Sequence, residues 1–104
     1  MAHHIRHHIN YILGGSGSTS SRCVQIALDG PCTIYIAARS GSSSSYSYRT
    51  VYAYVGSSSI GSMTVSSNSS VSVSAISYTG TGSTLSVYSS RSVYIYHIEI
   101  DYNV

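Results

Sequence analysis

The sequence predicts an all-β fold, an antiparallel two-sheet β-sandwich or jelly roll of about eight strands. β-branched and aromatic residues alternate with Ser and Thr over most of the chain, which is typical of half-buried strands and not of disordered polar tracts. Turns rich in Gly and Ser separate these segments at intervals of roughly 8 to 14 residues. No segment shows the period of an amphipathic helix.

The first two predicted strands cover residues 5–13 and 22–28. On the first strand, one side carries Ile5, Ile9, Tyr11 and Leu13. A flexible turn at residues 14–17 follows it. On the second strand, the face opposite Gln25 carries Val24, Ile26 and Leu28. The turn at residues 29–31 ends this strand, because Gly tolerates positive φ and Pro lacks a ladder donor, and we expect a hairpin there.

The third and fourth predicted strands cover residues 32–39 and 48–55, with a polar loop at residues 40–47 between them. Alternation turns one set of side chains of the third strand toward the core, namely Cys32, Ile34, Ile36 and Ala38. On the fourth strand the inward set is Val51, Ala53 and Val55. The opposite face of that strand carries Thr50, Tyr52 and Tyr54.

Four further strands complete the prediction, at residues 60–65, 71–78, 84–88 and 93–101. The apolar phase shifts by one residue in two of them, and a β-bulge is the usual cause of such a shift. One shift lies between Val73 and Ile76, and the other lies near Tyr96 and His97.

Composition excludes several classes of function. Only 8% of residues are charged and the net charge is +2, which is too little for a nucleic-acid-binding surface. No apolar run reaches the roughly 20 residues that span a bilayer, and the N-terminus lacks the pattern of a signal peptide. We expect one domain at residues 9–104, with residues 1–8 as a His-rich leader or the start of the first strand.

Neither a cofactor nor a metal site is predicted. On a strand His3 and His7 share one face and His4 and His8 the other, so the four imidazoles do not converge, and a tag-like leader explains them. Cys32 should point inward and Cys23 outward on its own strand, so we expect two free thiols.

No catalytic apparatus is evident, and we expect a protein that is not an enzyme. The chain has only three carboxylates, Asp29, Glu99 and Asp101, and Asp29 lies in a turn. A paired acid and base is therefore improbable, and no nucleophile elbow lies between a strand and a helix.

Tyrosines and arginines are the candidate binding residues. Five tyrosines should point away from the core, namely Tyr35, Tyr52, Tyr54, Tyr94 and Tyr96. Such rings stack on sugars, pair across strands or form contacts between subunits. Arginines are more often solvated surface charges. If any pair binds a ligand, it is Arg39 and Arg49, because they flank the loop at residues 40–47 and should converge at one end of the sandwich, where guanidinium groups would suit carboxylates. The predicted ligand-binding set is Tyr35, Arg39, Arg49, Tyr52 and Tyr54.

Five stretches, taken in order, resemble the pectin-binding carbohydrate-binding modules that are appended to secreted bacterial pectate lyases. These stretches are residues 17–22, 27–33, 38–44, 78–82 and 95–100. The resemblance implies a noncatalytic, extracellular β-sandwich that binds acidic plant-wall polysaccharide through basic side chains. Those modules use lysines, and this chain has none, so no binding residue is carried over by position.

Two alternatives to a polysaccharide-binding module remain open. Scarce charge and dense Ser and Tyr fit a structural subunit of an extracellular fibre or surface assembly, a homo-oligomer formed through Tyr-rich strand faces or the N-terminal strand. The absence of Lys, Phe and Trp also fits an engineered sandwich.

Overall fold

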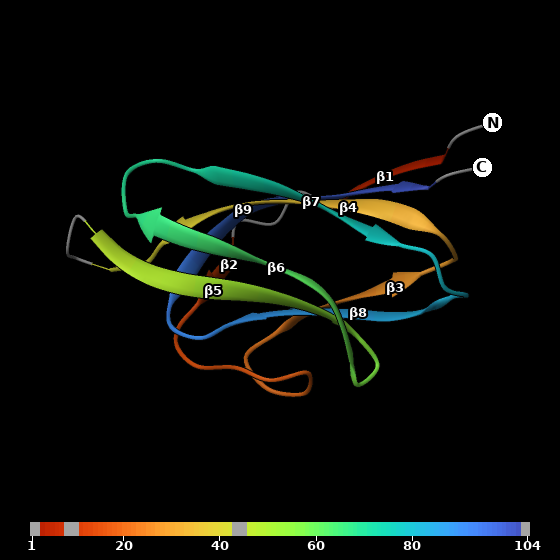
Figure 1. Cartoon of the computed structure of the whole chain (residues 1–104), viewed down its shortest axis with the longest axis horizontal. Coiled ribbons are helices and arrows are strands. Elements are labelled where there is room, and N and C mark those ends of the chain that lie inside the picture. Colours follow the sequence, from red (N-terminus) through yellow and green to blue (C-terminus); the bar gives the residue numbers. More distant parts are fainter. Residues whose placement is uncertain (1–2, 8–10, 43–45, 103–104) are drawn as a thin grey trace.

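A computed structural model describes residues 3–7, 11–42 and 46–102. Within them, nine strands form two antiparallel sheets that pack face to face, which confirms the predicted all-β sandwich (Figure 1). We call the five-stranded sheet "sheet A" and the four-stranded sheet "sheet B".

Sheet A has β9 (Val93–Tyr102) and β4 (Cys32–Ser40) at its centre. The edge strand β7 (Ser72–Tyr78) pairs with β4. On the other side, β1 (His3–His7) and β2 (Tyr11–Leu13) both pair with β9. The antiparallel pairing of β1 with β9 brings the two ends of the chain to the same end of the molecule (Figure 1).

Sheet B has the strand order β3, β8, β5, β6. Its strands are β3 (Val24–Leu28), β8 (Ser83–Ser89), β5 (Tyr46–Val55) and β6 (Ser58–Ser67). A tight turn at Gly56, whose φ is 62°, joins β5 to β6 as a hairpin. Glycine suits this turn because a side chain is strained at positive φ.

The core lies between the sheets and follows the alternation of the strands. Strand β4 alternates buried and half-buried residues along its whole length, and the inward sets predicted for β3, β4 and β5 are confirmed. The largest fully buried side chains include Leu13, Ile34, Ile36, Leu85, Ile95, Ile98 and Ile100.

The predicted hairpin at residues 29–31 is wrong. Strand β3 pairs with β8 in sheet B, whereas β4 pairs with β9 and β7 in sheet A, so the turn carries the chain from one sheet to the other. The backbone N–H of Asp29 donates a hydrogen bond to the hydroxyl of Tyr102 in sheet A, at 3.0 Å. Gly and Pro signal that a strand ends, but they do not determine whether its successor pairs with it or faces it across the core.

One of the two predicted bulges is present. Ala37 pairs with His97 and Ala38 pairs with Ile95, so Tyr96 is the extra residue in β9. The bulge predicted between Val73 and Ile76 is wrong, because β7 pairs with β4 without a register shift. Val73 is 69% exposed and simply points to solvent from an edge strand.

The first predicted strand is found as two strands, β1 and β2, and the predicted core position Ile9 lies outside the described residues. Both cysteines are free thiols, with Cys32 fully buried and Cys23 half-buried. Burial raises the pKa of the Cys32 thiol. Among the described residues, no helix is long and apolar enough to span a membrane.

Candidate functional site

The five residues predicted to bind a ligand occupy three separate places. Tyr52 and Tyr54 point outward from sheet B, on β5. Tyr35 and Arg39 point outward from sheet A, on β4. Because the outer faces of a sandwich look in opposite directions, these two pairs do not form one site.

Arg49 is the member of the set that does not point outward. It shares the inward phase of β5 with Val51, and its side chain is only 7% exposed. Its Nη1 donates to the carbonyl oxygen of Ser92 at 2.5 Å and to the Ser92 hydroxyl at 2.8 Å. Burial lowers the pKa of Arg49, and the charge of Arg91 lowers it further. Arg49 therefore connects β5 to the segment before β9. It lies toward the same end of the sandwich as Arg39, because Ser92 precedes Val93, the partner of Ser40, but its guanidinium is turned inward and does not share the outer face that carries Arg39.

On the outer face of sheet B, three tyrosines form a row. The Tyr88 ring contacts both of the others, with its centroid 5.1 Å from that of Tyr52 and 5.5 Å from that of Tyr54. Burial, and then a hydrogen bond with the Tyr54 side chain, raise the pKa of Tyr88. Such contacts hold the rings in fixed positions. We call Tyr52, Tyr54 and Tyr88 "the tyrosine row".

Sequence reasoning missed Tyr88, although its signal was present. Leu85 and Val87 are buried on β8, so alternation directs Tyr88 outward, as it does for Tyr52 and Tyr54. The pairing of Tyr52 with Tyr88 was hidden because β5 and β8 are far apart in the sequence.

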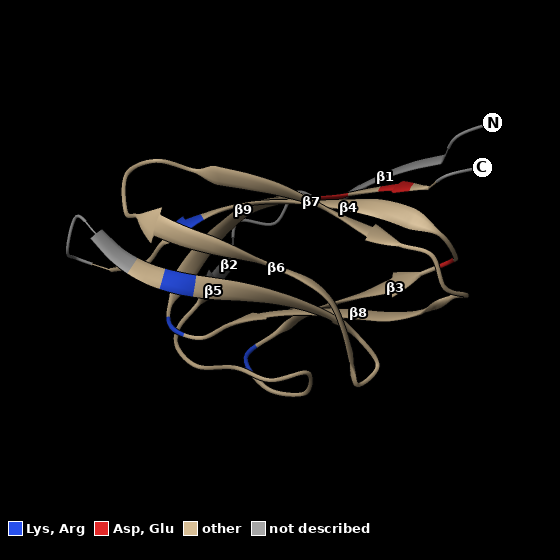
Figure 2. Ribbon diagram, in the orientation of Figure 1, with Lys and Arg blue, Asp and Glu red and all other residues tan. Residues whose placement is uncertain are grey.

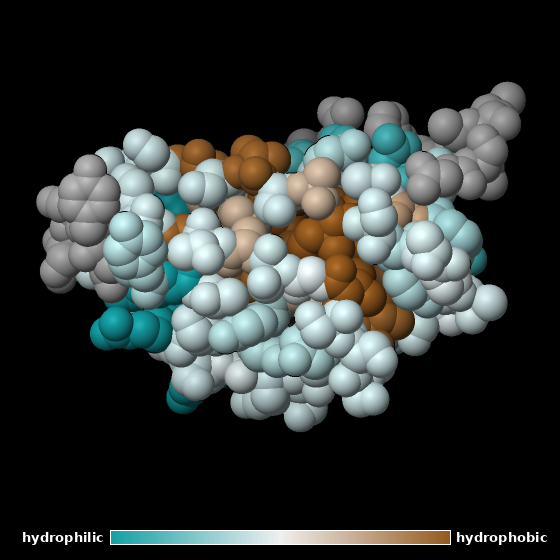
Figure 3. All heavy atoms as spheres, viewed as in Figure 1, coloured by the Kyte–Doolittle hydropathy of each residue, from teal (hydrophilic) through white to brown (hydrophobic). Residues whose placement is uncertain are grey.

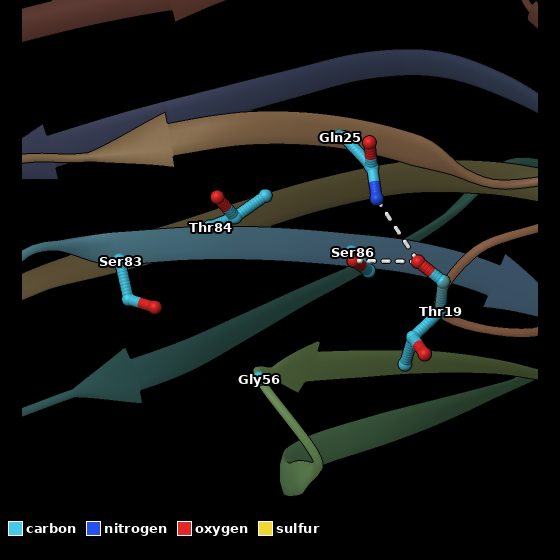
Figure 4. A pocket seen from close by; sticks show the side chains of 6 residues that line it. All are labelled: Thr19, Gln25, Gly56, Ser83, Thr84 and Ser86. Carbon is cyan, nitrogen blue, oxygen red and sulfur yellow. Dashed lines mark hydrogen bonds between the residues drawn. The ribbon is translucent and has the colours of Figure 1, made fainter.

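Beside the tyrosine row, the surface has a hollow of about 410 Å³ with mostly polar walls. The strand pairing connects the two features, because Tyr54 of the row is the register partner of Ser86 in the hollow. The residues that line the hollow are Thr19, Gln25, Gly56, Ser83, Thr84 and Ser86 (Figure 4). Hydroxyl and amide groups of this kind both donate and accept hydrogen bonds.

One side of the hollow is formed by the loop between β2 and β3, which contributes Thr19. The carbonyl oxygen of Thr19 accepts hydrogen bonds from Gln25 Nε2 at 3.0 Å and from Ser86 Oγ at 3.3 Å (Figure 4). Gly17 donates its N–H to Ser89 O, and a Cβ at Gly17 would lie 3.0 Å from the Cβ of Tyr88. The loop is thus fastened to β8 and β3 next to the tyrosine row.

On the outer face of sheet A, Arg39 lies between two tyrosines. Its guanidinium carbon is 4.0 Å from the ring centroid of Tyr94 and 6.0 Å from that of Tyr96. Its Nε donates to the Tyr96 hydroxyl at 2.7 Å and its Nη1 to Ser40 O at 3.0 Å. Tyr35 lies four residues back along β4, about 13 Å away at the usual strand rise.

Charge is unevenly distributed along the molecule. Outside β1, the arginines lie toward the end of the sandwich remote from the termini, and the acidic residues lie from its middle toward the termini (Figure 2). The arginines concerned are Arg22, Arg39, Arg49 and Arg91, and the carboxylates are Asp29, Glu99 and Asp101. On β1, Arg6 pairs with Glu99. In the middle of β9, His97 Nε2 lies 3.6 Å from Glu99 Oε1. No group of three or more His, Cys, Asp or Glu within the described residues is placed to hold a metal ion.

Comparisons with known proteins support the fold. No family model matches the sequence, and no curated protein matches it. Among solved structures, a "Carbohydrate-Binding Module CBM36 in complex with calcium and xylotriose" matches with a TM-score of 0.64 and 11% identity. The match covers 94% of this chain and 98% of that one. At this identity the likeness shows a shared β-sandwich fold alone.

Proposed function

We propose that this chain is a noncatalytic carbohydrate-binding module that binds a polysaccharide on the outer face of sheet B. The observation that carries the proposal is the tyrosine row beside the polar hollow. Aromatic rings offer an apolar face to the C–H groups of a sugar ring, and hydroxyl and amide groups bond to its hydroxyls. A glycan chain lying along the row would place neighbouring sugar units over the rings and in the hollow.

The fold likeness supports a glycan as the ligand. A protein with the same architecture over nearly its whole length is a carbohydrate-binding module solved with xylotriose. We carry over neither its ligand nor its calcium, because 11% identity does not align binding residues.

The chemistry of the hollow supports binding without catalysis. Its described lining consists of Ser, Thr, Gln and Gly, and therefore includes no carboxylate, imidazole or thiol. Hydrolysis of a glycosidic bond ordinarily requires two positioned carboxyl groups. Two of the chain's three carboxylates belong to β9 of sheet A.

We further propose that the ligand is an acidic, pectin-like polysaccharide of plant walls, so that the module acts outside the cell. The gathering of arginines at one end supports this choice, since it favours the approach of a polyanion to that end (Figure 2). Arg22 belongs to the loop that borders the hollow and is exposed, with its Nη1 3.4 Å from Ser16 O. The resemblance to pectin-binding modules points to the same ligand class.

Isothermal titration tests the proposal with polygalacturonate and a panel of neutral glycans. We expect heat with at least polygalacturonate, and about a tenfold loss of affinity in Tyr54→Ala, as for the loss of one stacked ring. Tyr35→Ala is the matched control, because it removes a half-buried tyrosine from the opposite face. The absence of heat with every glycan would contradict the proposal, and heat with neutral glycans alone would contradict the pectin-like ligand.

A second candidate function is self-association in an extracellular assembly. The observation that favours it is an apolar area at the seam between β6 and β7 (Figure 3). Val73, on the edge strand β7 of sheet A, is 69% exposed, and Val71, just before that strand, is 47% exposed. Exposed β-edges pair readily with other chains. Light scattering at high concentration tests it, and a strictly monomeric species excludes it.

A further inference from the structure

Arg39 is held in one position by its surroundings on sheet A. The Tyr94 ring supports the guanidinium from one side, the Tyr96 hydroxyl accepts its Nε–H, and Ser40 O accepts an Nη1–H. A guanidinium positioned in this way loses little conformational entropy when it binds a ligand. The arrangement is therefore suited to recognition and exceeds what a solvated surface charge requires.

The positive charge of Arg39 is not neutralised within the part of the chain that the structure describes. The protein has three carboxylate side chains. Glu99 and Asp101 pair with Tyr35 and Thr33, four and six residues from Arg39 along β4, and Asp29 precedes that strand. A guanidinium has five N–H donors, and the bonds to Tyr96 and Ser40 use two of them among the described residues. The other donors can meet a planar carboxylate in a bidentate manner.

Tyr96 supplies the second half of the arrangement. It is the extra residue of the β9 bulge, and it is 41% exposed. Bulges are common next to functional sites. Its ring offers an apolar face next to the guanidinium, and its hydroxyl, which accepts from Arg39, still has a proton to donate.

We propose that the outer face of sheet A carries a second glycan site, centred on Arg39 and Tyr96, that binds the carboxylate-bearing sugar of an acidic polysaccharide. The carboxylate meets the guanidinium of Arg39 and the sugar ring lies against Tyr96. This inference rests on the proposed function, and it adds that the module has two sites that face opposite ways. Such a module can hold two polysaccharide chains together.

Titration with trigalacturonate and with xylotriose, an uncharged trimer, separates the two sites. We expect the wild-type protein to bind two molecules of trigalacturonate and Arg39→Gln to bind one. The affinity lost at the Arg39 site should be about tenfold or more, as for the removal of a charged hydrogen-bonded pair. Xylotriose binding, where present, should be the same in both proteins.

Arg91→Gln is the matched control, because Arg91 is exposed in the connection between β8 and β9, two residues before Val93, which pairs with Ser40 next to Arg39. It removes the same charge and should change trigalacturonate binding less than twofold, as expected for a solvated surface charge. Tyr96→Phe keeps the ring and removes the acceptor of the Arg39 Nε–H, so we expect a smaller loss of about threefold at the second site.

The outcomes distinguish the two proposals. If wild-type protein binds one trigalacturonate, and Arg39→Gln leaves that binding unchanged while Tyr54→Ala weakens it, the second site is wrong and the proposed function stands. Equal losses of trigalacturonate affinity in Arg39→Gln and Arg91→Gln would mean that net charge alone causes the loss, and would overturn the second site. Binding of no glycan at all overturns both.

Discussion

The outer face of sheet A and the outer face of sheet B differ in charge. On β4 and β9 of sheet A, the charged side chains and the histidine that point outward are Arg39, His97, Glu99 and Asp101. Sheet B presents no outward charged side chain from the described parts of its strands, since Arg49 is turned inward. Its outer face is built of tyrosine rings, hydroxyls and one amide.

This difference indicates which forces each face uses to bind a ligand. The tyrosine row and the hollow offer apolar contact and neutral hydrogen bonds, which salt hardly affects. Arg39 offers a charged group near the surface, whose attraction to an anion weakens as ions screen it. The same sandwich therefore presents two chemistries to a glycan, and both depend on the alternation that seals the core between them.

The largest expected effect is on stability, and it differs between the inward arginine of sheet B and the outward arginine of sheet A. Arg49→Ala should lower the free energy of unfolding by about 2 to 3 kcal/mol, because it leaves Ser92 without its charged partner inside the fold. Arg39→Ala should cost at most about 1 kcal/mol, because its contacts are at the surface. Urea unfolding monitored by tyrosine fluorescence measures both, and equal losses would contradict the assignment of Arg49 to structure.

The next effect concerns the tyrosine row itself. Tyr88→Ala removes the ring that touches both Tyr52 and Tyr54, so it should weaken glycan binding about tenfold or more and lower stability by roughly 1 to 2 kcal/mol. Tyr88→Phe keeps the ring and should retain most of both properties. Calorimetric titration together with thermal unfolding checks the pair, and glycan binding unaffected by Tyr88→Ala would exclude the row as the binding surface.

Salt should have a smaller effect, and it should change glycan affinity on one face only. Raising the ionic strength to about 1 M shortens the Debye length to about 3 Å, so trigalacturonate should lose affinity at the Arg39 site. The affinity of the tyrosine row for an uncharged glycan should not change. Titrations at low and high salt measure this, and a parallel loss for charged and uncharged ligands would remove the distinction between the faces.

The smallest effect is a pH dependence at the tyrosine row. The pKa of Tyr88 is raised above its ordinary value of 10.0, so the unfolded chain ionises at this residue before the folded one does. Stability from this cause is complete below about pH 10 and is lost as the pH rises through the folded pKa. Tyr88→Phe should therefore lose less stability between neutral pH and about pH 11 than the wild type does, as measured by urea unfolding. An identical decline in both proteins would contradict the shift.

Local pattern was enough to predict most of the sandwich. Alternation correctly turned Val51 and Ile34 inward and Tyr52 and Tyr54 outward, and the phase change at Tyr96 revealed the bulge. Strand pairing does not follow from local pattern. The turn after Leu28 predicts a hairpin, yet its two strands lie in different sheets, because partners on the same sheet and partners across the core share one apolar pattern.

The candidate site depended on contacts that local pattern does not contain. Arg49 occupies an inward position, but its charge suggested solvent, and Ser92, which satisfies it, lies 43 residues away in the sequence. The hollow exists because Thr19 in a loop accepts a hydrogen bond from Ser86, 67 residues further along. Such long-range contacts follow from the packing of the sheets and are visible only in three dimensions.

The most direct test of the central claim is a nuclear magnetic resonance titration of the labelled protein with galacturonate oligomers. The account predicts that the amide and tyrosine ring signals of Tyr52, Tyr54 and Tyr88 shift, together with the amides of Thr84 and Ser86 in the hollow. Unchanged signals at these five residues, under conditions in which the oligomer binds, would contradict the claim that sheet B carries the glycan site.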